Sequence, residues 1–251
     1  MSNRKPYFHR TSLLLGDKVM QRLEDVRVII FGVGGVGSWC AEGLIRSGVE
    51  NLTIVDSDTV CLTNVNRQMM ATVNTVGRVK VDALKERLLE INPDAKIVAI
   101  KTIYTSDTAK DFDLASYDYI VDAIDSLKDK VTLILKATNS RGKFYSSMGA
   151  ALKIDPTGIE VSEFWKVKGC PLARALRQRF KKLKEYPAKK FLCVYSEEHN
   201  ENKKEESGDP SLIENKGNFK KAQVNGSLMH ITAMFGLTLA GLIIKDNLID
   251  S

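Results

Sequence analysis

The sequence contains no CxxC pair, although it has four cysteines, Cys40, Cys61, Cys170 and Cys193. Cysteine pairs at that spacing are the usual ligands of a structural zinc ion, so we expect no zinc site. The opening residues, MSNRKPYFHR, also lack the apolar core of a secretory signal. Isolated cysteines without such a segment favour a reducing compartment, and we expect a cytoplasmic protein.

Long hydrophobic runs are scarce as well. The last apolar run, 228–244, has 17 residues including one His, which reaches only the lower limit for a membrane span. Gly236 and Gly241 lie inside it and suit a packed helix. We therefore expect a final apolar helix over 226–245 that is buried against a sheet, with membrane association through this helix as the alternative.

Positive charge is concentrated in one segment. The 251 residues carry a net charge of +6, and 43% of them are hydrophobic, enough for a full core. Between positions 174 and 190 there is one acidic residue, Glu185, and there are eight basic residues: Arg174, Arg177, Arg179, Lys181, Lys182, Lys184, Lys189 and Lys190. Such a stripe suits a phosphate backbone, and the alternative is a solvated helix face.

The most specific pattern is a nucleotide-binding βαβ unit between positions 27 and 56. A strand-like run, 28–31, leads directly into four glycines, and a second apolar strand, 52–55, ends on Asp56. Glycines permit a tight turn and close approach of the backbone to phosphate, while the following helix offers free N–H groups. Asp56 suits a pair of ribose hydroxyls. The glycines are Gly32, Gly34, Gly35 and Gly37.

Polar residues beyond Asp56 distinguish ATP from a dinucleotide. Hydride transfer develops little charge on phosphate, whereas breaking the α–β phosphate bond of ATP needs cations around it. Arginine binds phosphate oxygens in a bidentate manner, lysine supplies a point charge, and an aspartate at a strand end can hold Mg²⁺. The candidate ATP and Mg²⁺ ligands are Asp58, Asn64, Asn66, Arg67, Gln68, Lys80, Asp122, Asp125 and Ser126.

Structural explanations exist for several of these residues. Asp58, Asn64 and Asn66 are common turn formers, and Asp122 equally suits an inward-facing residue that orients its neighbours. Lys80 begins a predicted helix over 77–91, where a positive charge opposes the helix dipole. This local conflict favours a functional reason for Lys80.

The block GVGGVGSW…IVDSDTV…TNVNRQ…GRVKVDAL…INPD…VDAIDS resembles the adenylating enzymes related to ubiquitin activation, a family that includes ThiF, MoeB and HesA. The resemblance implies that Gly34 approaches ATP and Asp56 binds ribose. It also implies that Asn64, Asn66 and Arg67 hold the triphosphate. Lys80 would stabilise charge on the phosphates, and Asp125 would bind Mg²⁺. Arg67, Lys80 and Asp125 are therefore the expected catalytic residues.

Within this family, IDPTGIEV, PLARALRQRFKK and CVYSEE are similar to the tRNA threonylcarbamoyladenosine dehydratases, also called TcdA, CsdL or YgdL. That branch implies ATP-dependent cyclisation of threonylcarbamoyladenosine through adenylation of its threonyl carboxylate. It also implies a homodimer, with a sulfur-relay protein as a further candidate partner. The basic segment, 166–190, would face tRNA. In the family an arginine near the first helix reaches the partner's ATP, whereas this sequence has Leu13 there and Arg10 nearby.

Two other functions compete with the dehydratase. The first is adenylation of the C-terminal glycine of a ubiquitin-like sulfur carrier, against which the missing zinc cysteines and the basic stripe count. The second is a non-enzymatic or dehydrogenase-like nucleotide-binding module, which would not need Asn64, Asn66, Arg67 and Lys80 together.

Alternation of strands and helices predicts the fold. We expect an α/β, Rossmann-like, doubly wound and mostly parallel sheet, with C-terminal extension strands and a terminal packed helix. Residues 1–150 would form the ATP-binding half and 151–251 a second half containing a hairpin over 152–164 and a mobile loop over 196–221. Expected helices are 12–24, 36–47, 77–91, 107–112 and 127–141; expected strands are 27–31, 52–55, 96–100, 118–121, 143–146 and 191–195.

Overall fold

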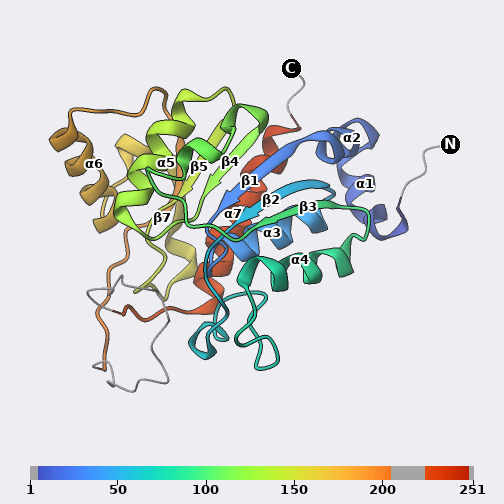
Figure 1. The fold of residues 1–251 in the computed structure, drawn as a ribbon, viewed down its shortest axis with the longest axis horizontal. Helices are drawn as coiled ribbons and strands as arrows, with labels where there is room; N and C mark the ends of the chain where they lie inside the picture. Colours follow the sequence, from blue (N-terminus) through green and yellow to red (C-terminus); the bar gives the residue numbers. More distant parts are fainter. Residues whose placement is uncertain (1–4, 205–223, 249–251) are drawn as a thin grey trace.

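The protein is built on one seven-stranded sheet in the order β3-β2-β1-β4-β5-β7-β6 (Figure 1). The computed structural model describes residues 5–204 and 224–248. All neighbouring strands are parallel except β6, which runs antiparallel to β7. The strands are β1 Arg27–Phe31, β2 Asn51–Val55, β3 Lys96–Ile100, β4 Tyr119–Asp122, β5 Lys143–Ser147, β6 Ile159–Glu163 and β7 Leu192–Ser196.

Helices cover both faces of the sheet (Figure 1). They are α1 His9–Leu15, α2 Asp17–Asp25, α3 Gly37–Arg46, α4 Lys80–Ile91, α5 Leu127–Asn139, α6 Pro171–Leu183 and α7 Met229–Asp246. Helices α3, α4 and α7 share one hydrophobic core, and α5 and α6 share the other. Short 3₁₀ turns are η1 Pro6–Phe8, η2 Leu62–Asn64, η3 Ala109–Asp111, η4 Leu114–Ser116, η5 Pro156–Gly158 and η6 Phe164–Lys166.

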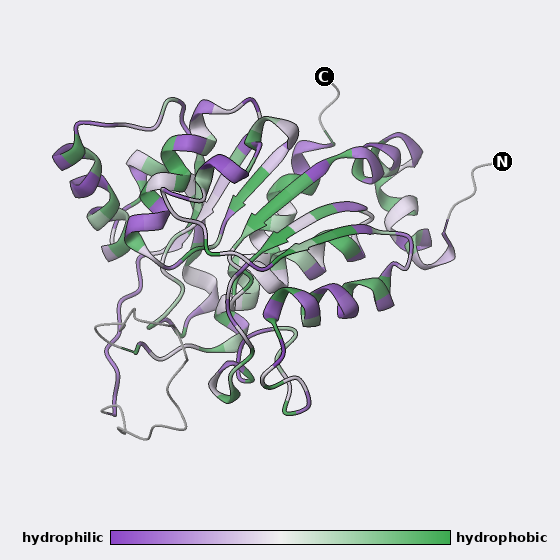
Figure 2. Cartoon of the chain, viewed as in Figure 1, coloured by the Kyte–Doolittle hydropathy of each residue, from purple (hydrophilic) through white to green (hydrophobic). Residues whose placement is uncertain are grey.

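The central strands are apolar on both sides because both sides are covered. In β1, Val28 and Ile30 enter the first core, whereas Ile29 and Phe31 enter the second. A strand buried on two faces needs a continuous apolar run rather than alternation, and Figure 2 shows the middle strands as hydrophobic. The doubly wound, mostly parallel fold is confirmed, and the predicted strands coincide closely with β1, β2, β3, β4, β5 and β7.

Three predicted helices differ from the structure, two of them at positive-φ glycines. The first helix is split into α1 and α2 at Gly16, whose φ is +76°. The helix expected from residue 77 begins at Lys80 instead, since Gly77 has a φ of +87°. A φ in this range is incompatible with a regular helix. The region near 107–112 forms only the 3₁₀ turn η3.

The predicted hairpin over 152–164 is wrong. Strand β6 pairs with β7, with Val161 opposite Val194, and residues 152–154 form no strand. Leu152 has a φ of +59°, which removes it from the β region. The 3₁₀ turn η5 at 156–158 instead connects a non-strand segment to β6.

The remaining predictions for the second half differ in outcome. Helix α7 begins at Met229, three residues after the predicted start. The predicted mobile loop, 196–221, lies largely outside the described residues, which end at 204 and resume at 224. The division of the chain into two halves at residue 150 stays a prediction. Strands β6 and β7 of the second half extend the sheet formed by the first half.

Helix α7 packs on α3 through small residues. A Cβ on Gly236 would lie 2.3 Å from the carbonyl oxygen of Val36 and 2.8 Å from the backbone nitrogen of Cys40. Glycine therefore sets how closely the two helices approach. By length and composition alone, Met229–Asp246 could cross a membrane, with 44% of the 18-residue window buried inside the protein. Its buried face is used for packing on α3.

Two glycines of α7 give a matched test of this packing. We expect Gly236→Ala to destabilise the fold by about 1–3 kcal/mol, because α7 must move away from α3. Gly241 has no atom within 4 Å of an added Cβ, so Gly241→Ala should stabilise α7 by about 0.5–1 kcal/mol. Denaturant unfolding of both variants measures this difference. Equal effects of the two substitutions would contradict the close approach of α3 and α7.

Candidate nucleotide-binding site

The predicted site residues meet where the central parallel strands end. Strands β1, β2 and β4 are neighbours that run in the same direction, so the segments after Phe31, Val55 and Asp122 emerge at one edge. Ligands of open α/β sheets bind at this carboxyl edge. The same site is therefore bordered by the glycine loop at 32–37, residues 56–68 and residues 123–126.

The glycine loop is shaped by close backbone contacts. Gly32 has a φ of +84°, and a Cβ there would lie 2.7 Å from the carbonyl oxygen of Ala123. A Cβ on Gly37 would lie 1.9 Å from the carbonyl oxygen of Gly32. Gly34 differs, because only Nε2 of Gln68 lies near it, at 3.8 Å. The loop is thus closed at Gly32 and Gly37 and open at Gly34, where a phosphate can approach the backbone.

The Asp56 carboxylate connects this loop to the end of β2. One oxygen accepts a hydrogen bond from the backbone N–H of Val33, at 2.9 Å, and the other accepts from that of Asp58, also at 2.9 Å. The side chain is half-buried. Both bonds fix its orientation at the edge, as a ribose-binding carboxylate requires.

Lys80 and Asp58 form an ion pair beside the loop. Nζ of Lys80 lies 2.9 Å from Oδ2 of Asp58, and the two side chains are 5% and 25% exposed. The backbone N–H of Lys80 also donates to the Asp58 carbonyl, at 3.0 Å. The negative partner offsets the unfavourable position of the lysine at the start of α4. The pair holds a cation at the edge where the triphosphate is expected.

The segment around η2 presents an amide and a guanidinium. Asn64 is fully buried, and its Oδ1 accepts from the backbone N–H of Cys61 at 3.1 Å. Nη1 of Arg67 donates to the Thr63 carbonyl at 2.8 Å and to Oδ1 of Asn66 at 3.0 Å. Asn64 acts as the turn former that sequence analysis considered. Asn66 is exposed and Arg67 is half-buried, so both remain accessible to phosphate.

Two residues of the GVGSW motif have roles that sequence analysis did not assign. Oγ of Ser38 donates to the Gly34 carbonyl at 2.6 Å and accepts from the backbone N–H of Met69 at 3.1 Å. Nε1 of Trp39 donates to the Arg67 carbonyl at 3.0 Å. Together they connect the glycine loop to the Arg67 segment. Their place in the motif was the available signal.

Asp122 has structural partners on three sides, and its predicted role as a nucleotide ligand stays a prediction. Its carboxylate is fully buried and lies 2.8 Å from Nζ of Lys130. It also accepts from Oγ of Ser146 at 2.7 Å and from the backbone N–H of Ile124 at 3.1 Å. Sequence analysis missed Lys130, whose position among Val131 and the other buried residues of α5 was the signal.

Asp125 is the exposed carboxylate of this edge. It precedes Ser126, which caps α5 by accepting from the backbone N–H of Asp129 and donating to its carboxylate at 2.7 Å. Mg²⁺ binds nucleotide phosphates with only one or two protein carboxylates and keeps several waters. A single exposed aspartate beside the glycine loop fits that requirement.

The two fully buried cysteines, Cys40 and Cys193, are unsuited to act as nucleophiles. Cys193 on β7 is fully buried, and burial raises the pKa of its thiol well above the ordinary value. Burial likewise raises the pKa of Cys40 in α3. A thiol that keeps its proton is a poor nucleophile, so both behave as core residues.

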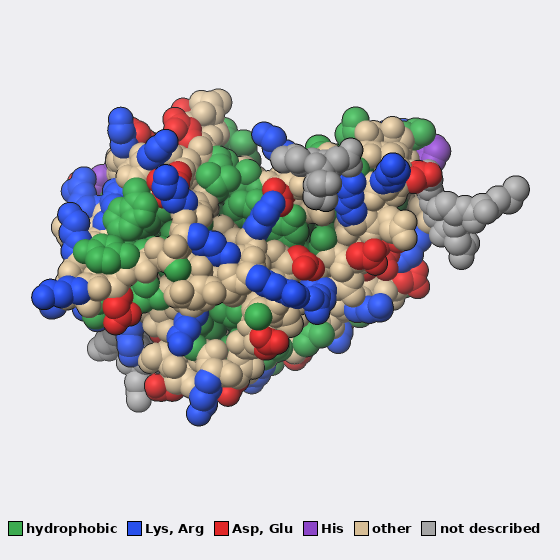
Figure 3. Space-filling model, turned by 90° about the horizontal axis from the view of Figure 1, so that it is seen from above, with side chains coloured by type: hydrophobic (Ala, Val, Ile, Leu, Met, Phe, Trp, Pro, Cys, Tyr) green, Lys and Arg blue, Asp and Glu red, His purple; other side chains and the backbone are tan. Residues whose placement is uncertain are grey.

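Five of the eight basic residues of the stripe lie on α6, at one end of the molecule, and Lys184, Lys189 and Lys190 follow the helix (Figures 1 and 3). Arg174, Arg179, Lys181, Lys182 and Lys184 are exposed. Arg177 differs, because its Nη1 donates to the carbonyls of Phe164 and Val167 at 3.0 and 2.9 Å. Its guanidinium also lies over the Phe164 ring, 5.8 Å from the centroid. Arg177 therefore fixes the turn beside α6 rather than facing solvent.

Asp122 at the end of β4 and Asp125 just beyond it should respond differently to substitution. Lys130→Met leaves the buried Asp122 without its cation and should destabilise the fold by about 3–5 kcal/mol. Asp125→Asn changes an exposed side chain and should alter stability by less than about 0.5 kcal/mol. Denaturant unfolding of both variants distinguishes these roles. A large loss of stability from Asp125→Asn would show that this carboxylate is also structural.

The chain is similar in sequence to known proteins over most of its length. The model of the ThiF family matches residues 8–246. A tRNA threonylcarbamoyladenosine dehydratase from Bacillus subtilis is 35% identical over 249 residues, which cover 97% of this chain and 95% of that protein. A molybdopterin-synthase adenylyltransferase from Escherichia coli is 32% identical over 64% of this chain and 62% of its own length.

The fold matches a solved structure over nearly its whole length. The crystal structure of the Escherichia coli tRNA N6-threonylcarbamoyladenosine dehydratase TcdA in complex with ATP superimposes with a TM-score of 0.81 and 31% sequence identity. The match covers 96% of this chain and 93% of that one. The chain belongs to the ThiF family.

Proposed function

We propose that this protein is an ATP-dependent tRNA threonylcarbamoyladenosine dehydratase. The observation that carries the proposal is the carboxyl edge itself. An open glycine loop, the Lys80–Asp58 pair and the exposed Asp125 follow strands that end at this one edge. The similarity to dehydratases over nearly the full length favours threonylcarbamoyladenosine, among the possible substrates of an adenylating enzyme, as the group that is adenylated.

The chemistry explains why ATP is needed. A carboxylate is a poor electrophile because its oxygen is a poor leaving group. Attack of the threonyl carboxylate on the α-phosphate forms an acyl-adenylate and releases pyrophosphate. The carbamoyl group of the same side chain then attacks the acyl carbon, AMP leaves with the carboxylate oxygen, and a proton is lost. The net change is the loss of one water and the formation of a five-membered ring.

Intramolecular closure requires mainly orientation, which can contribute several kcal/mol without a protein nucleophile. Arg67 and Lys80 would neutralise charge on the departing pyrophosphate. The open backbone at Gly34 would receive the phosphates, and Asp56 would hold the ribose. Mg²⁺, held by Asp125 when bound with ATP, would supply further positive charge to the phosphates.

The exposed face of α6 supplies the expected contact with tRNA. Five exposed cations on one helix and its C-cap suit a phosphate backbone. A homodimer is also part of the proposal. Leu13 and Leu14 of α1 are 73% and 83% exposed, which suits a helix buried by a second copy. Arg10 is exposed nearby and would be the source of any arginine that reaches the partner's ATP.

Two further aspects belong to the proposal. We place the enzyme in the cytoplasm, where its tRNA substrate is found, with membrane association through α7 as a secondary arrangement. A sulfur-relay protein is a candidate partner, because relatives of this family include adenylyltransferases of sulfur carriers. Activation of the C-terminal glycine of such a carrier is the alternative function.

The first activity test uses AMP release from ATP. We expect release with tRNA that carries threonylcarbamoyladenosine and none with tRNA that lacks it. Arg67→Ala should lower kcat/KM about 100-fold, since it removes a group that binds developing phosphate charge. Arg141→Ala, an exposed arginine before β5, is the control and should leave the rate unchanged. Adenylation of a carrier's terminal glycine, without a response to tRNA, would support the alternative.

Salt dependence tests the tRNA face. Combined Lys181→Gln and Lys182→Gln substitutions should weaken tRNA binding and reduce its salt slope by about 1 for each phosphate that is no longer neutralised. Arg177→Ala should instead lower stability by about 1–3 kcal/mol, because two carbonyls lose their donor. Filter binding at several salt concentrations and thermal unfolding measure the two effects. An unchanged slope in the double variant would show that Lys181 and Lys182 do not neutralise tRNA phosphates.

A further inference from the structure

Among the described residues three lysines are buried, and only two of them have a carboxylate partner. Lys80 pairs with Asp58 and Lys130 with Asp122, at 2.9 and 2.8 Å. Lys153 is 5% exposed and forms no ion pair within the described ranges; its Nζ donates to the carbonyl oxygen of Glu198. Burying an ammonium without a counter-charge is costly. Lys153 therefore differs from Lys80 and Lys130 in having no carboxylate partner among the described residues.

The charge of Glu198 acts on Lys153, but its carboxylate forms no ion pair with the lysine and is hydrogen-bonded elsewhere. Oε2 of Glu198 accepts from the backbone N–H groups of Ile154 and Asp155, at 2.9 and 3.0 Å. Its Oε1 accepts from Nδ2 of Asn200 at 2.6 Å. The Glu198 carboxylate thus holds the backbone of Ile154 and Asp155, and only the main-chain carbonyl of Glu198 accepts a hydrogen bond from Lys153. An ammonium has three donor hydrogens, so two remain for another acceptor.

A strained residue precedes Lys153. Leu152 has a φ of +59°, a backbone conformation that is unfavourable for any residue with a Cβ. Its N–H donates to the Gly226 carbonyl at 2.9 Å, and its carbonyl accepts from the backbone N–H of Asn200 at 3.2 Å. Strain that the surroundings maintain in this way is characteristic of functional segments. Here it directly precedes a buried lysine.

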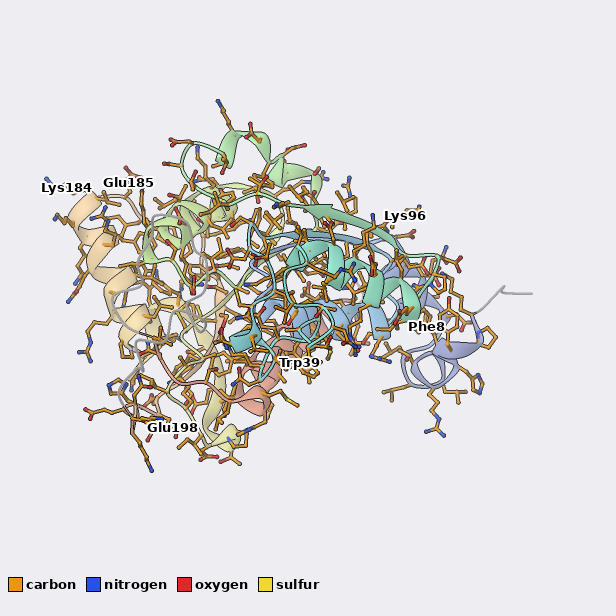
Figure 4. All side chains as sticks on the ribbon, turned by 60° about the horizontal axis from the view of Figure 1, so that its bottom comes forward. Phe8, Trp39, Lys96, Lys184, Glu185 and Glu198 are labelled. Carbon is orange, nitrogen blue, oxygen red and sulfur yellow. The ribbon has the colours of Figure 1, made fainter. Side chains whose placement is uncertain are left out.

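Lys153 belongs to the same edge as the nucleotide site. It follows β5, and Glu198 follows β7, two adjacent strands that run parallel to β4. Strands lie about 4.8 Å apart, so the end of β7 is roughly 10 Å from the end of β4. In Figure 4, Glu198 and Trp39 both lie in the lower part of the view, whereas Lys184 lies at the far end of α6.

We propose that Lys153 is the cationic end of a subsite for an oxyanion of the RNA substrate. The inference rests on the proposed function and names a second anion site on its substrate. The oxyanion is either the threonyl carboxylate of the modified base or a phosphate of the adjoining backbone, since both accept charge-assisted hydrogen bonds from an ammonium. The bound oxyanion takes the place of the carboxylate that Lys153 lacks.

The protonation of Lys153 gives an independent readout. Burial lowers the pKa of Lys153 below its ordinary value, while Cys170 and Glu198, the groups that act on it from the start of α6 and the end of β7, raise it in part. The lysine therefore loses its charge at a lower pH than a solvated lysine. If the charge binds the substrate, the KM for tRNA must rise as the pH rises through that lowered pKa.

The experiment compares Lys153→Met and Lys153→Arg in the full chain, with AMP release and the modified tRNA as substrate. We expect Lys153→Met to raise the KM for tRNA about 10- to 100-fold, the loss typical of a hydrogen bond to a charged group, with the KM for ATP unchanged. Lys153→Arg should keep a low KM at alkaline pH, since arginine stays charged. Lys96→Met, an exposed lysine at the opposite edge, is the control.

Binding measurements identify the source of the oxyanion. If Lys153→Met weakens binding only of tRNA that carries threonylcarbamoyladenosine, the ligand is the carboxylate. If it weakens binding of modified and unmodified tRNA equally, the ligand is a backbone phosphate. Either result supports the subsite.

Other outcomes overturn it. A lower melting temperature of Lys153→Met with an unchanged KM for tRNA would make Lys153 a structural residue. If that variant does not fold, the pH profile decides, and the same alkaline rise in wild type and Lys153→Arg would reject the role of its charge. The wild-type chain is assayed first. If it releases no AMP with modified tRNA, the proposed function is contradicted, and the variants no longer test the subsite.

Discussion

The buried ion pair between Asp122 and Lys130 is the interaction on which the site depends. It lies at the end of β4, the strand between β1, which leads into the glycine loop, and β5. Asp122 also accepts from Ser146 of β5 and from the backbone after β4. One carboxylate thereby fixes two strand ends and the path of the chain toward Asp125. Without its lysine, that charge would be buried in the centre of the fold.

The site uses carboxylates to position groups that act at the surface. Asp56 holds the glycine loop through Val33, Asp58 holds Lys80, and Asp122 holds the segment that carries Asp125. Each acid is the last residue of its strand or lies just beyond it. The parallel sheet brings these ends together, so one edge collects fixed anions, an accessible carboxylate and cations. Such preorganisation is what charge stabilisation in phosphate chemistry requires.

Much of the first half of the fold could be predicted from the sequence, because its signals are local. Continuous apolar runs marked the buried strands, and the glycine spacing predicted the tight loop after β1. Long-range pairing was not accessible in the same way. The partner of β6 is a strand about 30 residues further on, and Leu152 gave no sign of its positive φ. Asp122 and Asp125 share a motif and a residue type, and only tertiary packing reveals which one is buried.

In the proposed function, ATP cleavage is coupled to the loss of water from modified tRNA. The most direct measurement combines AMP release with mass spectrometry of the nucleosides from the same reaction. We predict one AMP for each threonylcarbamoyladenosine that loses the mass of a single water, and neither product with tRNA lacking the modification. AMP release that does not depend on the modification, or that leaves the nucleoside mass unchanged, would contradict it.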